Sequence, residues 1–108
     1  MAATKRVNIF QIDGEYRVHP PVIELDGGAG DRLSVRNTTG DDIVVFVAPK
    51  AFHATDSVSL VVPSGKEKNM ASVSQGAGVV NVFSYQVLTL KEGKKAKGNS
   101  DPVLIIEN

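Results

Sequence analysis

The sequence predicts an all-β protein, an antiparallel β-sandwich of about seven or eight strands, on three observations. Apolar and polar residues alternate along most segments, which is typical of strands with one buried face. Gly, Pro, Asp and Ser separate these segments at short intervals. No segment has the apolar spacing of an amphipathic helix. We therefore expect residues 1–108 to form one sandwich domain.

The longest predicted strand covers residues 78–90, and it is the stretch that the other strands must flank. Its residues from Phe83 to Val87 alternate strictly, with the aromatic side chains on one face. After Val87 the apolar positions shift to Leu88 and Leu90, which predicts a bulge or a strand that changes sheets.

A β-hairpin is predicted near the N-terminus, where Asp13-Gly14 joins residues 7–12 to residues 15–18. A type I′ turn needs positive φ at both central residues, and Asp-Gly supplies it. The other expected strands are residues 22–25, 31–37, 43–47, 58–62, 66–74 and 102–106. Within residues 48–55 a single helical turn remains an alternative.

The core prediction takes inward positions from several strands. The expected core residues are Ile9, Val35, Val45, Leu60, Phe83, Tyr85, Val87 and Ile105. The aromatic residues Phe46 and Phe52 are also expected in the core rather than in a ligand platform, since aromatic side chains are mostly buried.

The order of these elements resembles the cupredoxin-like fold, a Greek-key β-sandwich. Residues 29–38 resemble the G-D-x-(apolar)-x-V-x-N segment that leads into the third strand of that fold. Residues 83–87 resemble its Y-x-C strand, and residues 98–106 resemble its closing strand. The resemblance covers most of the chain from Pro21 onward.

A working cupredoxin binds copper through two histidines, one cysteine and usually a methionine. Val87 occupies the Y-x-C cysteine position here. The following loop has Lys94, Lys95 and Lys97 where a histidine and a methionine would lie, and residues 41–43 contain no histidine. We therefore expect no blue-copper chemistry and no cofactor.

No group of residues in the sequence forms a recognisable catalytic site. The chain has no cysteine and no G-x-S-x-G motif, and neither histidine has an identifiable acid to orient it. Glu24 and Glu67 are a conceivable acid/base pair without support in the sequence. The favoured function is a non-catalytic binding or accessory domain that presents end loops or a sheet edge to a protein partner.

The lysines Lys94, Lys95 and Lys97 are the candidate partner-binding residues, because a basic loop attracts an acidic partner. The alternative is an ordinary solvated loop. A net charge of zero, with no aromatic residue among these lysines, argues against nucleic acid. No apolar run approaches the roughly 20 residues that span a membrane, so no membrane insertion is expected. The compartment is not determined by the sequence.

A second hypothesis is a metal-binding or redox protein with a non-standard site built from His19, His53 and Met70, with Asp56 as a further candidate ligand. The alternative is two surface-loop histidines, because metal sites need several ligands at supporting spacing. Four aspartates, which flank two turns expected at one end of the sandwich, allow either a calcium site or turn-stabilising side chains; they are Asp26, Asp31, Asp41 and Asp42.

Overall fold

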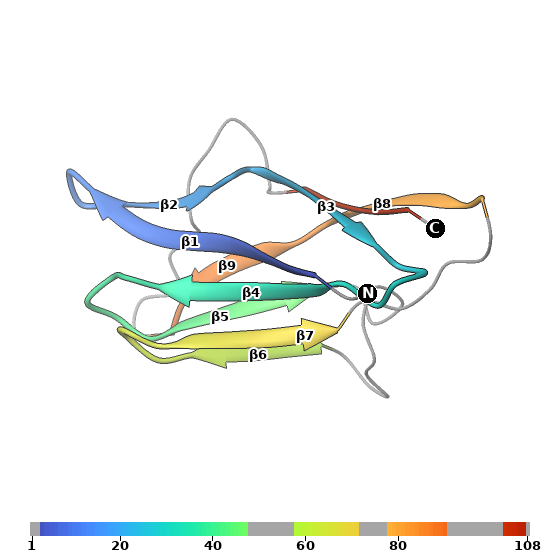
Figure 1. Ribbon diagram of the computed structural model, residues 1–108. Coiled ribbons are helices and arrows are strands. Elements are labelled where there is room, and N and C mark those ends of the chain that lie inside the picture. The colour runs from blue at the N-terminus through green and yellow to red at the C-terminus, as the bar shows by residue number, and fades with distance from the viewer. Residues whose placement is uncertain (1–2, 48–57, 72–77, 91–102, 108) are drawn as a thin grey trace.

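The computed structural model describes residues 3–47, 58–71, 78–90 and 103–107, and these residues form ten strands and no helix (Figure 1). The chain is therefore all-β, as the sequence predicts. The strands are β1 (Thr4–Ile12), β2 (Glu15–His19), β3 (Val22–Asp26), β4 (Arg32–Asn37), β5 (Ile43–Val47), β6 (Val58–Val62), β7 (Glu67–Ala71), β8 (Val80–Ser84), β9 (Gln86–Thr89) and β10 (Val103–Glu107).

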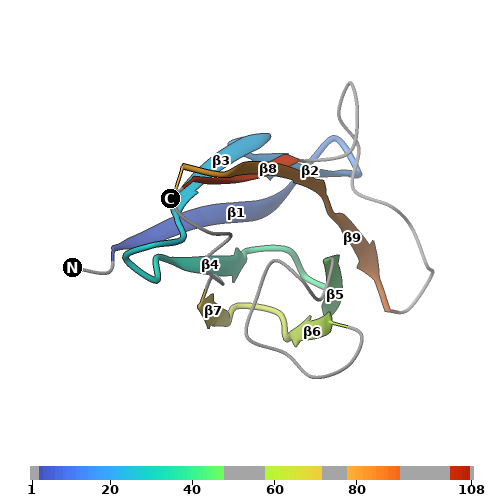
Figure 2. The same ribbon diagram turned by 90° about the vertical axis from the view of Figure 1, so that its right-hand side faces the viewer.

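The strands form two layers with the core between them (Figure 2). One layer is a four-stranded sheet in the order β2-β1-β4-β7. The other consists of two three-stranded sheets, β3-β10-β8 and β6-β5-β9, which the continuous β8–β9 ribbon connects. Of the seven strand pairs described, β1/β4 and β3/β10 are parallel. The two sheets that contain these pairs are thus mixed, because the chain crosses between layers before these partners pair, whereas the β6-β5-β9 sheet is antiparallel.

The N-terminal hairpin forms as predicted. Ile12 pairs with Glu15 across the turn. Both central residues have positive φ, 51° at Asp13 and 78° at Gly14, which is the type I′ signature. This backbone chemistry fixes the register of β1 against β2.

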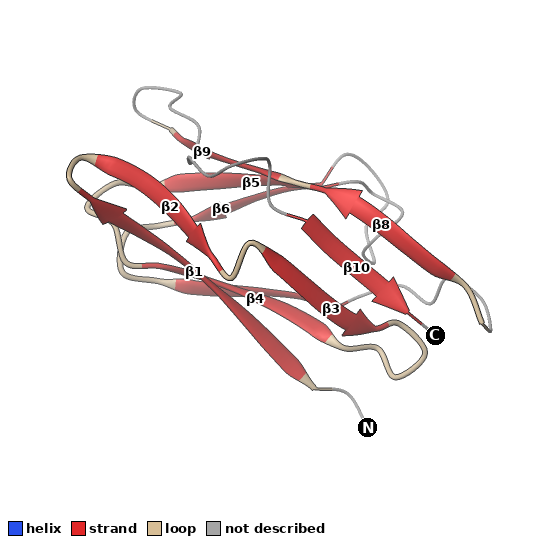
Figure 3. Ribbon diagram, turned by 90° about the horizontal axis from the view of Figure 1, so that it is seen from above, coloured by secondary structure: helices blue, strands red, loops and turns tan. Residues whose placement is uncertain are grey.

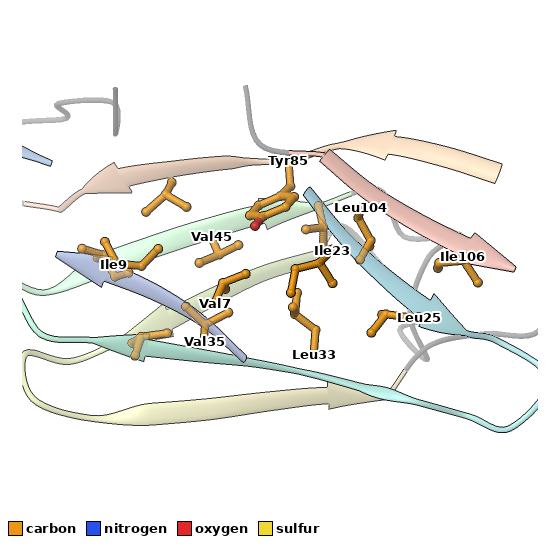
Figure 4. Packing of buried hydrophobic residues seen from close by; sticks show 14 residues of the cluster. Val7, Ile9, Ile23, Leu25, Leu33, Val35, Val45, Tyr85, Leu104 and Ile106 are labelled. Atoms are coloured by element: carbon orange, nitrogen blue, oxygen red, sulfur yellow. The ribbon is translucent and has the colours of Figure 1, made fainter. Parts of the chain in front are cut away.

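The core lies between the two layers (Figure 4). The predicted core residues that are buried are Ile9, Val35, Val45, Tyr85 and Val87. Leu60 and Phe83 are half-buried and pack against this cluster. The structure therefore confirms most of the predicted interior.

Ile105 is a correction to the predicted core. It is half-buried on the outer face of β10, while Leu104 and Ile106 are fully buried. Four consecutive apolar residues carry no alternation, so the sequence does not reveal which pair points inward. Phe46 is a second correction: it is 43% exposed because its neighbour Val45 occupies the inward position of β5.

The β8–β9 ribbon changes sheets, as expected, but without the predicted change of phase. Strand β8 pairs with β10, and strand β9 pairs with β5. Inward positions continue from Tyr85 through Val87 to Thr89, which is 3% exposed, whereas Leu90 is 51% exposed. The ribbon is interrupted at Tyr85, between β8 and β9. The single strand predicted over residues 78–90 is therefore two strands, which is one reason why the structure has more strands than the expected seven or eight.

Candidate functional site

The two described members of the predicted metal site do not lie together. His19 is exposed at the end of β2, and Met70 packs against the core from β7. These strands are the two edges of one sheet, so three inter-strand spacings, about 14 Å, separate them. His53 and Asp56 lie outside the described residues. Within the described ranges, no three His, Asp or Glu side chains are grouped as metal ligands would be.

The four aspartates lie at two ends of the sandwich rather than at one. Asp26 and Asp31 precede β4, and Asp41 and Asp42 follow it. A six-residue strand is about 20 Å long, so the four carboxylates cannot share one cation. The expected single cluster is wrong, because the strand predicted at residues 31–37 forms as β4 and places the two turns at its opposite ends.

Asp31 ties the start of β1 to the turn before β4. Its carboxylate accepts hydrogen bonds from the backbone N–H groups of Ala3, at 2.8 Å, and Asp26, at 2.9 Å. These two bonds, that from Asp26 first, lower the pKa of Asp31 below its ordinary value. Asp31 is therefore a structural residue.

The turn between β4 and β5 is closed by the buried side chain of Asn37. Its amide donates to the carbonyls of Asp41 and Val62, at 2.8 and 2.9 Å, and its oxygen accepts from the N–H and hydroxyl of Thr39. Asp41 also accepts the hydroxyl of Tyr16. The polar groups at this end thus satisfy one another, and they explain Asn37 as a turn-forming residue.

The remaining predicted candidates do not form a site among the described residues. Glu24 lies on β3, whereas Glu67 lies on β7 of the other layer. The lysines Lys94, Lys95 and Lys97 lie outside the described residues, so their role in partner binding stays a prediction.

An apolar surface instead occupies the outer face of the β3-β10-β8 sheet, whose strands lie side by side in Figure 3. Val82 opposes Ile105, and Val103 lies between Ser84 and Val22. The exposed fractions are 49% for Val22, 56% for Val80 and 64% for Val82. We call this surface the valine stripe; its members are Val22, Val80, Val82, Val103 and Ile105.

Acidic side chains border the valine stripe along β3 and the end of β10. Glu24 is in register with Ile105, and Asp26 is in register with Glu107. All three carboxylates are exposed. Next to them is an open hollow of about 400 Å³ that Asp31 and Lys5 also line. The surface therefore combines an apolar side with an acidic side.

Sequence reasoning assigned no function to the valine stripe, although one signal was present. Val80 and Val82 are out of phase with Tyr85 and Val87, so the alternation itself places them on the outer face. The contribution of Ile105 was not readable, because its strand is apolar throughout.

No protein-family profile matches the chain, and no curated protein sequence matches it. In the part of the chain that the structure describes, no helix has the length and apolar character needed to cross a membrane.

Proposed function

We propose that this protein is a non-catalytic binding domain that docks a protein partner on the valine stripe. The observation that carries the proposal is the exposure of Val80 and Val82 beside Ile105 on one sheet face. Scattered exposed apolar residues are normal, but a contiguous group with a polar border is typical of an interaction surface.

The border indicates the chemistry of the partner. Glu24, Asp26 and Glu107 place negative charge along one side of the apolar residues. A complementary surface has aliphatic or aromatic side chains in its centre and Lys or Arg at one edge. Two copies of this face would align less well, because their acidic borders repel each other.

We also propose that the fold is the cupredoxin-like Greek-key sandwich without its copper site. Counting β8 and β9 as one ribbon gives a second layer in the order β3-β10-(β8–β9)-β5-β6, which supports this proposal. Val87, at the position of the cysteine ligand, is only 2% exposed and contributes an inert side chain. Titration with Cu(II) should therefore produce no blue absorption band, and such a band would contradict the proposal.

Site-specific photo-crosslinking tests the docking face. A photoreactive residue at Val82 should capture one partner, whereas the same residue at Lys66, in the exposed turn before β7, should not. The captured protein is then purified, and its binding to the wild type and to a Val80→Glu/Val82→Glu variant is measured by calorimetry. We expect the variant to bind at least about tenfold more weakly.

Equal capture from both positions would contradict the assignment, and so would unchanged binding of the purified partner to the variant. Thermal unfolding of the variant provides the folding control, since both valines are exposed. A Lys94→Ala/Lys95→Ala/Lys97→Ala variant tests the lysine segment in the same assay, where unchanged affinity would remove that segment from the interface.

A further inference from the structure

All four arginines of the chain lie on one surface, the outer face of the β2-β1-β4-β7 sheet. Each arginine is exposed and has at least one buried apolar neighbour along its strand, which points inward. The buried neighbours are Val7, Tyr16, Leu33 and Val35. We call this surface the arginine face; its arginines are Arg6, Arg17, Arg32 and Arg36.

Three of these arginines form a compact group across two parallel strands. Arg6 of β1 is in register with Ser34 of β4, and Ser34 lies between Arg32 and Arg36. Arg6 is therefore a diagonal neighbour of both, at roughly 7–8 Å between backbone positions. Arg32 and Arg36 are four residues apart on one strand, about 13 Å.

Glu67 binds Arg6 directly, and it also attracts Arg36, its register partner on β4, without a hydrogen bond to it. Its carboxylate accepts from the Ser34 hydroxyl and from Arg6 Nε, the latter at 3.0 Å, and these bonds lower the pKa of Glu67. Arg32 and Arg36 make no side-chain hydrogen bond or ion pair with the described residues. The exposed guanidinium groups of Arg32 and Arg36 thus lie on either side of Arg6, which Glu67 already orients.

The arrangement of charge on the two layers indicates the partner. The chain has no net charge, yet its arginines occupy one outer face while Glu24, Asp26 and Glu107 border the other. Guanidinium groups bind carboxylates bidentately, and the spacing of about 13 Å between Arg32 and Arg36 matches residues four positions apart on one face of an extended peptide.

We propose that the arginine face is a second docking surface, which binds an extended acidic segment of a partner protein through Arg32 and Arg36. Carboxylates four positions apart in that segment pair with these two arginines. Glu67 and Glu15 remain on or beside the face, and they disfavour a dense polyanion such as nucleic acid. This inference does not depend on the valine stripe.

The probe is a fluorescent ten-residue peptide that alternates Glu with Thr, with a Gln/Thr peptide as its uncharged control. Fluorescence anisotropy at low salt should show binding of the Glu peptide alone, weakening as salt increases. An Arg32→Gln/Arg36→Gln variant should bind it about tenfold more weakly or not at all. The matched control is Lys66→Gln/Lys68→Gln, which removes the same charge from the exposed β6–β7 region and should bind like the wild type.

An Arg32→Lys/Arg36→Lys variant separates geometry from charge and should also lose affinity, because an ammonium group does not bind a carboxylate bidentately. No binding of the Glu peptide would overturn the proposal. Equal losses of affinity in Arg32→Gln/Arg36→Gln and in the control Lys66→Gln/Lys68→Gln would also overturn it. Tighter binding of a single-stranded oligonucleotide would overturn it in favour of nucleic acid. Self-association abolished by Arg32→Gln/Arg36→Gln would assign the face to a second copy of the chain.

Discussion

Two buried tyrosines show how the environment of one hydroxyl decides whether it stabilises the fold. The Tyr16 hydroxyl donates to Asp41 and ties β2 to the β4–β5 turn. The Tyr85 hydroxyl is buried and has no hydrogen-bond partner among the described residues, and this burial raises its pKa. Tyr85 contributes through its ring, whereas its hydroxyl carries an uncompensated desolvation cost.

A Tyr85→Phe variant should therefore be more stable than the wild type by about 1 kcal/mol, because it removes a buried unpaired polar group. The free energy of unfolding in urea measures this change. Tyr16→Phe is the matched control: it removes the same atom but breaks a hydrogen bond, so it should reduce stability. A loss of stability in Tyr85→Phe would contradict the interpretation.

Asp31 makes the stability of the protein depend on pH. Because its folded-state pKa is lowered, the stabilisation is fully present above the unfolded pKa of about 3.9 and is lost as the pH falls through the folded pKa. Asp31→Asn should lower the free energy of unfolding by about 1–3 kcal/mol at pH 7, because an amide N–H then faces a backbone N–H.

Urea unfolding from about pH 2 to pH 7 tests this dependence, and the difference between Asp31→Asn and the wild type should shrink toward the acidic end. Asp13→Asn, in the exposed hairpin turn, removes the same charge and should leave stability almost unchanged. A pH-independent difference between Asp31→Asn and the wild type would show that the carboxylate charge is not the cause.

At the scale of elements, the β8–β9 ribbon and β10 decide which apolar residues are core and which are surface. Leu104 pairs with Phe83 on the inner face, and Ile105 pairs with Val82 on the outer face. Neighbouring residues of one strand, with nearly the same side-chain volume, therefore have different roles. Leu104 stabilises the sandwich, while Ile105 belongs to the valine stripe.

Leu104→Ala should accordingly cost about 2–5 kcal/mol of stability, because it leaves a cavity in the core. Ile105→Ala should cost clearly less, since solvent already reaches part of its side chain. Thermal and urea unfolding compare the two variants. Equal losses would mean that the outer face of β10 is covered as completely as its inner face.

At the scale of the whole molecule, the two layers give the domain two outer surfaces of different chemistry. The valine stripe is apolar with an acidic border, and the arginine face is polar and basic. The core separates the two surfaces, so ligands on them do not contact each other. Together, the two proposals describe an adaptor domain that can hold two partners at once.

Binding at the two faces should therefore be independent. Arg32→Gln/Arg36→Gln should leave the affinity for the crosslinked partner unchanged, and Val80→Glu/Val82→Glu should leave affinity for the Glu peptide unchanged. Calorimetric titration of one ligand into protein saturated with the other checks both statements. A change of more than about threefold in either case would indicate that the sites overlap or are coupled.

Local sequence patterns by themselves determined the all-β class, the hairpin at Asp13-Gly14 and most of the core. Alternation, turn residues and backbone preferences act over a few neighbouring residues, so these features are readable along the chain. Even the outward phase of Val80 and Val82 follows from that alternation.

Only the tertiary structure decided which strands pair beyond that hairpin, which pairs are parallel and where distant side chains meet. The phase of residues 103–106 and the position of Arg6 beside Arg32 and Arg36 both depend on pairings between distant segments. Such pairings follow from the closure of one shared core, and no short segment contains the information that determines it.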